Sequence, residues 1–236
     1  MTVKLCIAFD ASCLGGARPT GVERSFLHTL GAFRALLAQA RMHLFVPCYL
    51  HASIAFDERA THDLRIPAGV DIHRIPRRVP TALWREALMP RRLEELQADV
   101  LWTPTTALPR RTGAVRRIAT VHEVPPLRCE ESPLRALRQR RARVALRSRA
   151  DAVVVPSDAT RRALLRESPR LAPRTHTIAQ PLDKAILRAS SEARAQAAGK
   201  GLLYVGAYRK RKNLERVAAA WSGVDPVLRG AHKFRW

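Results

Sequence analysis

Short apolar runs alternate with amphipathic stretches along most of the chain. Within the amphipathic stretches, apolar residues recur at helical spacing, as Val22, Phe26, Leu30 and Phe33 do. The apolar runs predict strands at residues 3–9, 43–46, 70–75, 99–102, 117–121, 152–155 and 175–178. The amphipathic stretches predict helices at residues 22–37, 81–96, 134–149 and 158–166. This alternation predicts an α/β domain with a mostly parallel sheet.

Capping residues support several of these helix boundaries. Ser132 and Pro133 form an N-cap followed by proline at the first helical position. Ser157 begins the next helix, and for Ser157 and Thr160 we prefer the interpretation as N-cap and first-turn residues over a catalytic role. Pro90 predicts a kink or a break within the helix at 81–96.

The order of elements predicts two domains of unequal size. Residues 1–182 are expected to form the α/β domain, and the polar, alanine-rich residues 183–199 a linker. From residue 200 to 236 a second domain begins, with a strand, a basic turn and a helix between residues 201 and 221. Residues 232–236 have the pattern of a strand entry. Such a short unit cannot bury a sheet of its own, so we expect the sequence to end inside a domain.

Composition narrows the class of protein. The 236 residues carry 42 Lys and Arg against 20 Asp and Glu, a net charge of +22, and only six of the basic residues are lysines. Hydrophobic residues make up 47% of the chain, which excludes a charged disordered tail. Arginine interrupts every apolar run long before the ~20 residues that span a bilayer. The charge is spread along the chain and aromatics are 6%, which argues against a specific nucleic-acid binder.

Cysteine spacing and the first strand indicate the compartment. The four cysteines show no paired spacing, and they are Cys6, Cys13, Cys48 and Cys129. This predicts a reduced, cytoplasmic protein without a zinc site. Residues 5–9 are too few for the core of a signal peptide.

Four motifs follow one another in a fixed order. They are Thr-Gly-Val-Glu-Arg at residues 20–24, Ala-Thr-Val-His-Glu-Val at 119–124, Ala-Asp-Ala-Val-Val-Val-Pro-Ser-Asp-Ala-Thr at 150–160, and Leu-Tyr-Val-Gly-Ala at 203–207, continued by Arg-Lys-Asn-Leu-Glu-Arg at 211–216. In this order and spacing they resemble the retaining glycosyltransferases of family four, which have the GT-B fold. The resemblance implies two Rossmann-like domains that face each other, the N-terminal one for the acceptor and the C-terminal one for most of a nucleotide-sugar donor.

The loop after the first strand is a candidate phosphate site. A glycine just before a helix lets backbone N–H groups approach a phosphate, helped by the helix N-terminus. Gly21 occupies the position of the family's loop glycine, so it ranks above Gly15 and Gly16, which remain candidates for lining the cleft. The alternative is a tight turn between strand and helix that simply needs glycine.

His122 is the candidate catalytic residue. It directly follows a buried strand, so it is expected at the carboxyl edge of the sheet, where open α/β sheets bind ligands. The resemblance implies that it hydrogen-bonds a hydroxyl of the transferred sugar; the alternative is a satisfied loop histidine. Glu123 stands where the family usually has Asp, and with Ser157 it is a candidate for lining the cleft.

Arg211 and Lys212 match the family's basic pair, which binds the donor diphosphate. Positioned cations neutralise the charge that develops on the leaving β-phosphate and can replace a divalent metal. We therefore expect no metal and no cofactor besides the nucleotide-sugar co-substrate. Arg209 and Lys210 are interpreted as solvated turn charges.

The family's pair of glutamates, seven residues apart downstream of the basic pair, is absent from this chain. We therefore expect either a C-terminally truncated or frameshifted product or a fragment whose remainder is encoded separately, with little or no activity from these 236 residues alone. The predicted function is transfer of a mannose-like or glucose-like hexose from a nucleotide-diphosphate sugar to a saccharide or lipid-linked acceptor in cell-surface polysaccharide synthesis. The alternatives are an inactive remnant that acts as a binding module, and a basic binder of nucleic acid or membrane surfaces.

The helix at residues 134–149 carries seven arginines. One interpretation is a solvated face. The other is a surface that rests on anionic lipid at the inner face of the membrane, with a thin apolar stripe of Leu134, Leu137, Val144 and Ala145 that Arg141 interrupts.

Overall fold

The computed structural model describes most of the chain in two compact units, residues 1–184 and 185–236. The described residues are 4–14, 20–47, 66–75, 78–124, 133–182, 187–189, 201–204 and 212–235. Most of the predicted linker at 183–199 lies outside them, as do the candidate residues Gly15, Gly16 and Arg211. Each unit is described by itself.

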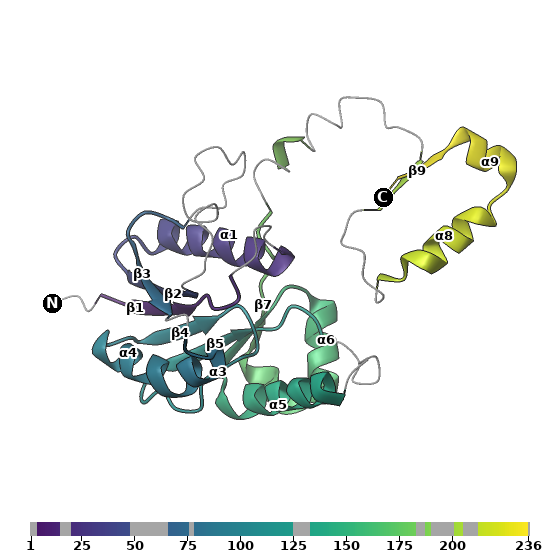
Figure 1. Ribbon diagram of the computed structural model, residues 1–236. Helices are drawn as coiled ribbons and strands as arrows, with labels where there is room; N and C mark the ends of the chain where they lie inside the picture. Colours follow the sequence, from purple (N-terminus) through teal and green to yellow (C-terminus); the bar gives the residue numbers. More distant parts are fainter. Residues whose placement is uncertain are drawn as a thin grey trace. The chain divides into compact units, whose positions relative to one another are not determined.

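Seven parallel strands form the sheet of the first unit, in the order β3-β2-β1-β4-β5-β6-β7 (Figure 1). Their bounds are β1 Cys6–Asp10, β2 Arg41–Pro47, β3 Val70–Ile75, β4 Val100–Thr103, β5 Arg116–Thr120, β6 Ala152–Val155 and β7 Thr175–Thr177. The predicted α/β class with a parallel sheet is confirmed. The strand order reverses between β1 and β4, and such reversal points bind ligands in doubly wound folds.

Helices lie on both faces of this sheet, with α1 on one face and α3, α4 and α5 on the other (Figure 1). The helical bounds are α1 Gly21–Leu36, α3 Thr81–Leu83, the π-helix η1 Trp84–Leu88, α4 Met89–Glu95, α5 Pro133–Arg149, α6 Asp158–Glu167 and the 3₁₀ helix η3 Pro169–Arg174. All four predicted helices are therefore present, with boundaries within a few residues of the expectation.

The core on the α1 face is aromatic. Phe26 and Phe33 of α1 pack against Phe9 of β1, and Phe33 meets Trp102 of β4 edge to face with ring centroids 4.7 Å apart. Further along the sheet, Ile118 and Val154 share a face with Trp102 and stay half-buried, whereas Ala119 and Val153 on the opposite face are fully buried. The α1 face is thus less completely covered over β5 and β6.

The helix predicted around Pro90 is continuous but contains a wide turn. The N–H of Met89 donates to the carbonyl of Trp84, five residues back, which makes residues 84–88 a π-helix. Proline has no N–H and its ring crowds the carbonyl four residues earlier, which here is that of Glu86. The wide turn accommodates Pro90 in place of the predicted kink or break.

The π-helical turn presents Arg85 to the carboxyl end of β1. The guanidinium Nε of Arg85 donates to Asp10 Oδ2 at 2.9 Å, and its Nη2 donates to Ser12 Oγ at 2.9 Å. The other carboxylate oxygen of Asp10 accepts from the Ser12 N–H at 3.0 Å. The Asp10 side chain is only 1% exposed, so Arg85 provides the countercharge that permits its burial.

We predict that Arg85→Met lowers the free energy of unfolding by about 3 kcal/mol, because it leaves the Asp10 carboxylate buried without a countercharge. Urea denaturation followed by circular dichroism measures this change. The matched control is Arg92→Met, which removes an exposed ion pair with Glu95 and should cost less than about 1 kcal/mol. Equal losses in the two variants would contradict the role given to the buried pair.

The second unit is a β-α-α-β arrangement. It comprises β8 Gly201–Leu203, α8 Leu214–Ser222, α9 Pro226–Ala231 and β9 Lys233–Arg235, with β8 parallel to β9. The predicted strand and helix after residue 200 and the strand entry near the end are confirmed. Helix α9 was not predicted, although Asp225 followed by proline is a start signal: its carboxylate accepts from the Val227 and Leu228 N–H groups.

Candidate functional site

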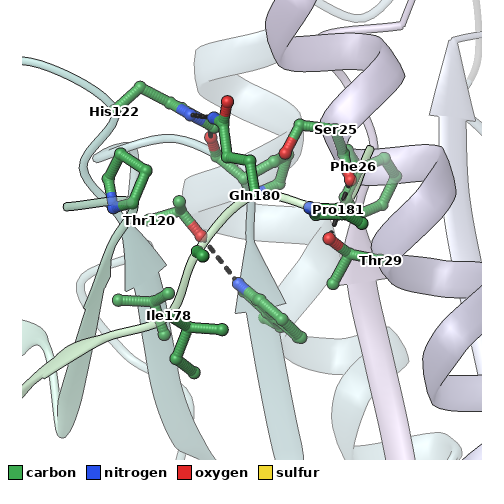
Figure 2. A pocket seen from close by; sticks show the side chains of 13 residues that line it. Ser25, Phe26, Thr29, Thr120, His122, Ile178, Gln180 and Pro181 are labelled. Atoms are coloured by element: carbon green, nitrogen blue, oxygen red, sulfur yellow. Dashed lines mark hydrogen bonds between the residues drawn. The ribbon is translucent and has the colours of Figure 1, made fainter. Parts of the chain in front are cut away.

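A small pocket lies at the carboxyl edge of the sheet, on the α1 side. Its walls come from α1 and from residues at or just after the ends of β4, β5, β6 and β7 (Figure 2). It is lined by Ser25, Phe26, Thr29, Trp102, Pro104, Thr120, His122, Val154, Pro156, Ile178, Ala179, Gln180 and Pro181. Its volume of about 40 Å³ has room for a few waters or for one polar group of a larger ligand.

His122 is held in this pocket through both ring nitrogens. Its Nε2 lies 3.1 Å from the carbonyl oxygen of Pro104, and its Nδ1 lies 2.7 Å from the amide nitrogen of Gln180 (Figure 2). Burial lowers the pKa of His122 below its ordinary 6.5, against the opposing effects of the Pro104 carbonyl and Glu123. The imidazole is therefore neutral at pH 7, which suits hydrogen bonding to a hydroxyl better than donation of a proton as an imidazolium.

The floor of the pocket is mostly apolar, and two hydrogen bonds pair polar atoms that line it. Trp102 Nε1 donates to Thr120 Oγ1 at 2.9 Å, and Thr29 Oγ1 donates to the carbonyl of Ser25 at 2.7 Å (Figure 2).

Cys13 follows β1 at the same edge of the sheet, and burial raises its pKa to about 12. A thiol with such a raised pKa stays protonated at neutral pH, and among the described residues the site gives Cys13 no activating base.

The first motif forms the start of α1 as a capping box. Thr20 Oγ1 accepts from the Glu23 N–H at 3.4 Å, and the Glu23 carboxylate accepts from the Thr20 N–H at 2.6 Å. Gly21 is the first helical residue, it does not have a positive φ, and a Cβ there would meet nothing within 4 Å. The backbone thus gives no reason for glycine at this position, which weakens the tight-turn alternative. Ser25, one turn later, lines the His122 pocket.

We predict that Gly21→Ala leaves folding stability unchanged or slightly higher, because the added methyl group enters open space. If backbone N–H groups at this helix start approach a phosphate, the same variant weakens binding of a nucleotide-diphosphate sugar several-fold. Thermal unfolding and isothermal titration calorimetry measure the two effects. Gly31→Ala is the matched control: it lies mid-helix in α1, also in open space, and should leave binding unchanged. Unchanged binding in both variants would remove Gly21 from the phosphate site.

Ser157 is the N-cap of α6, as predicted. Its Oγ accepts from the Thr160 N–H at 3.2 Å. Thr160 Oγ1 in turn lies 3.5 Å from the carbonyl oxygen of His122, at the limit of a hydrogen bond. Ser157 is not one of the residues that line the His122 pocket, so its place is beside the site rather than in it.

Glu123 lines a different pocket. This second pocket, of about 220 Å³, lies among the residues that follow β4 and β5 and the helices α5 and α6. Leu146 and Leu164 contribute apolar walls, and Arg143 pairs with Glu167 at 2.8 Å on its polar side. The structure therefore brings His122 together with the first turns of α1, but it does not bring Glu123 into the same pocket.

Lys212 is exposed and lies just before α8 in the second unit. Asn213, the N-cap of α8, has φ 54°, and its side chain makes no capping hydrogen bond.

In the part of the chain that the structure describes, no three His, Cys, Asp or Glu side chains are grouped as a metal site. Over the same residues, no helix is long and apolar enough to span a membrane.

The sequence did not indicate three features at this edge of the sheet. Gln180 lies 58 residues from His122, and no periodicity links the two. Pro104 contributes a backbone carbonyl, which any residue possesses. The Asp10–Arg85 pair joins residues 75 positions apart. Asp10 follows directly after the apolar residues of the first strand. A carboxylate at that position is the one sequence signal that marks the end of β1 as a polar site.

Comparison with known proteins now identifies the class. Residues 19–185, more than half of the chain, match the family model described as Glycosyltransferase Family 4. The chain therefore belongs to glycosyltransferase family 4.

Solved structures show the same fold. The crystal structure of Anabaena Alr3699/HepE in complex with UDP-glucose is similar with a TM-score of 0.60 and 15% identity, over 98% of this chain and 59% of that one. The crystal structure of Anabaena Alr3699/HepE in complex with UDP and glucose gives a TM-score of 0.58 and 16% identity, over 97% and 59%. At such identity the likeness establishes the fold, a Rossmann-like α/β fold matching the GT-B glycosyltransferases. Comparison with curated protein sequences gives no significant match.

The chain spans about 59% of the length of the HepE chain. The residues that the family model matches lie almost entirely in the first unit, which contains the His122 pocket.

Proposed function

We propose that the activity to which this chain contributes is transfer of a hexose, with retention of anomeric configuration, from a nucleotide-diphosphate sugar to a saccharide or lipid-linked acceptor in cell-surface polysaccharide synthesis. The observation that carries the proposal is the neutral His122 at the carboxyl edge of a family 4 domain, in one pocket with the first turns of α1. The binding of UDP-glucose by HepE, whose fold is similar, supports a nucleotide sugar as donor.

The proposed reaction requires two kinds of contact. The bond between the sugar C1 and the β-phosphate oxygen breaks, a bond from C1 to an acceptor hydroxyl oxygen forms, and the proton of that hydroxyl passes to the departing β-phosphate oxygen. His122 hydrogen-bonds a hydroxyl of the transferred sugar. The N-terminal N–H groups of α1 near Gly21, together with Arg211 and Lys212, stabilise the departing nucleoside diphosphate. Because these groups supply positive charge, we propose that transfer needs neither a metal ion nor a further cofactor.

A transfer assay tests this function. The chain is incubated with UDP- and GDP-hexoses and with saccharide or lipid-linked acceptors, and products are identified by mass spectrometry. Addition of EDTA should leave the rate unchanged, and NMR of the product should show the anomeric configuration of the donor. An inverted product would contradict the retaining mechanism. Nucleotide-sugar binding without transfer or hydrolysis would favour the alternative of a binding module.

Lys212 offers a sharper test of the donor site. We predict that Lys212→Ala weakens binding of UDP-glucose by about 10-fold or more, since a charge-assisted hydrogen bond contributes about 1.5–3 kcal/mol. Isothermal titration calorimetry at low salt measures the affinity. Lys4→Ala is the matched control, because Lys4 is exposed and lies before β1, at the opposite edge of the sheet from the strand ends that form the pocket. An unchanged affinity for Lys212→Ala would overturn its role.

The outward face of α5 favours a peripheral membrane location. Five exposed residues at helical spacing form this α5 outer face: Leu137, Arg140, Arg141, Val144 and Arg147. Leu137 and Val144 are 45% and 55% exposed and lie along its middle, with arginines on either side. Ala145, expected in the apolar stripe, is buried in the core instead. We propose that this face rests on anionic lipid at the inner side of the membrane.

We predict that Arg140→Glu combined with Arg147→Glu lowers binding to phosphatidylglycerol-containing vesicles at least ~10-fold, since each basic residue near such a surface contributes about 1 kcal/mol. Vesicle co-sedimentation at low and high salt measures the binding. The control, Arg166→Glu with Arg170→Glu, makes the same charge change at exposed positions of α6 and η3. Equal losses would indicate that net charge alone drives the association. Tight, salt-sensitive binding to duplex DNA would favour the nucleic-acid alternative.

A further inference from the structure

Gln180 lies at the rim of the His122 pocket, among the last described residues of the first unit. It is exposed, and its side chain reaches toward the imidazole, as Figure 2 shows. The distance of 2.7 Å between Gln180 Nε2 and His122 Nδ1 is short for a neutral hydrogen bond. The neighbouring residues Ala179 and Pro181 line the same pocket, so the segment after β7 closes one side of it.

The two partners of His122 together define one tautomer. A backbone carbonyl can only accept, so the nitrogen that faces Pro104, Nε2, must carry the proton. An amide nitrogen can only donate, so Nδ1, which faces Gln180, must be the unprotonated acceptor. If the Gln180 amide were rotated by half a turn, its oxygen would face Nδ1, and Nδ1 would then have to carry a proton in addition to Nε2. The ring would be a charged imidazolium, which burial in this pocket disfavours.

We propose that Gln180 is the positioning residue of His122 in the unliganded protein: together with the Pro104 carbonyl, its amide N–H holds the ring as the neutral Nε2–H tautomer and marks Nδ1 as the nitrogen that meets the ligand. The Pro104 carbonyl belongs to the backbone and stays in place, whereas the exposed Gln180 amide can be displaced. A ligand group that takes its place at Nδ1 must be a donor. This ligand is therefore a hydroxyl compound whose O–H donates to His122, rather than an acceptor to which His122 donates.

The inference deepens the proposed function, and its identification of the ligand rests on that function. The tautomer itself does not depend on catalysis, so it can be tested separately. Among the described residues, the one titratable side chain whose charge acts on His122 is Glu123. A substitution at Gln180 leaves that carboxylate unchanged.

The first experiment is NMR of the full 236-residue chain, labelled with ¹⁵N at histidine. In the wild type we expect a protonated Nε2, an unprotonated Nδ1, and a pKa of His122 below 6.5. Gln180→Met removes the donor and should raise this pKa toward 6.5. Gln180→Glu supplies a carboxylate that accepts from a protonated Nδ1, so the pKa should move above 6.5. A purely structural role for Gln180 would shift the Met and Glu variants alike, which would overturn the proposal.

Two controls make this result specific. Ala179→Glu places the same charge one residue earlier, and it should move the pKa of His122 less than Gln180→Glu does. His43 and His73, whose pKa values burial also lowers, lie on β2 and β3 and serve as internal references that none of the variants should change. Because Gln180 is exposed, thermal unfolding should be the same in all variants. A wild-type ring protonated on Nδ1 would also overturn the proposal.

The second experiment tests the direction of the ligand hydrogen bond. UDP-glucose is compared by calorimetry with its deoxy and deoxyfluoro analogues at each hydroxyl position. Fluorine accepts weakly but cannot donate, so at the position that meets Nδ1 both analogues should bind about equally weakly. At some positions the deoxy analogue will lose affinity. If the fluoro analogue keeps its affinity at every one of these positions, His122 donates the hydrogen bond to the sugar, and the ligand assignment is overturned. Absence of any UDP-glucose binding would count against the proposed donor while leaving the NMR result to decide the role of Gln180.

Discussion

The seven strands that the structure describes in the first unit all run parallel, and this single constraint decides where its chemistry lies. Parallel strands end at the same edge of a sheet, so the residues that follow them are neighbours in space although they are far apart in sequence. The order of the strands reverses between β1 and β4, which leaves an opening that no crossover helix has to cover. Asp10, Pro104, His122 and Gln180 all belong to this edge for that reason.

Several polar side chains at this edge are paired with one another where they are buried or half-buried. Asp10 is buried against Arg85, Trp102 donates to Thr120, and His122 uses both ring nitrogens. An unpaired group in such surroundings would lose its hydration without compensation. The pairing also orients each group, because its partner lies on a different strand or helix. Stability and the arrangement of the site thus depend on the same hydrogen bonds.

Part of the high arginine content has a structural explanation. Several arginines join elements of the first unit to one another: Arg117 pairs with Asp151, Arg143 with Glu167, and Arg149 with Glu86. Arg174 donates to the carbonyls of Ala150 and Arg147 at the end of α5. These contacts use the several fixed donors of the guanidinium group, which lysine lacks. The exposed remainder includes the arginines on the outer face of α5.

The sequence by itself determined the class of fold, the place of nearly every strand and helix, and the position of His122 after β5, because hydrophobic periodicity and helix caps are local properties of the chain. The capping role of Ser157 followed in the same way. Only the tertiary structure decided that Gln180 meets His122, that Glu123 lines a separate pocket, and that a π-helical turn aims Arg85 at Asp10. These outcomes depend on strand order and on how side chains pack between distant segments. Neither property produces a periodic pattern of residues in the sequence.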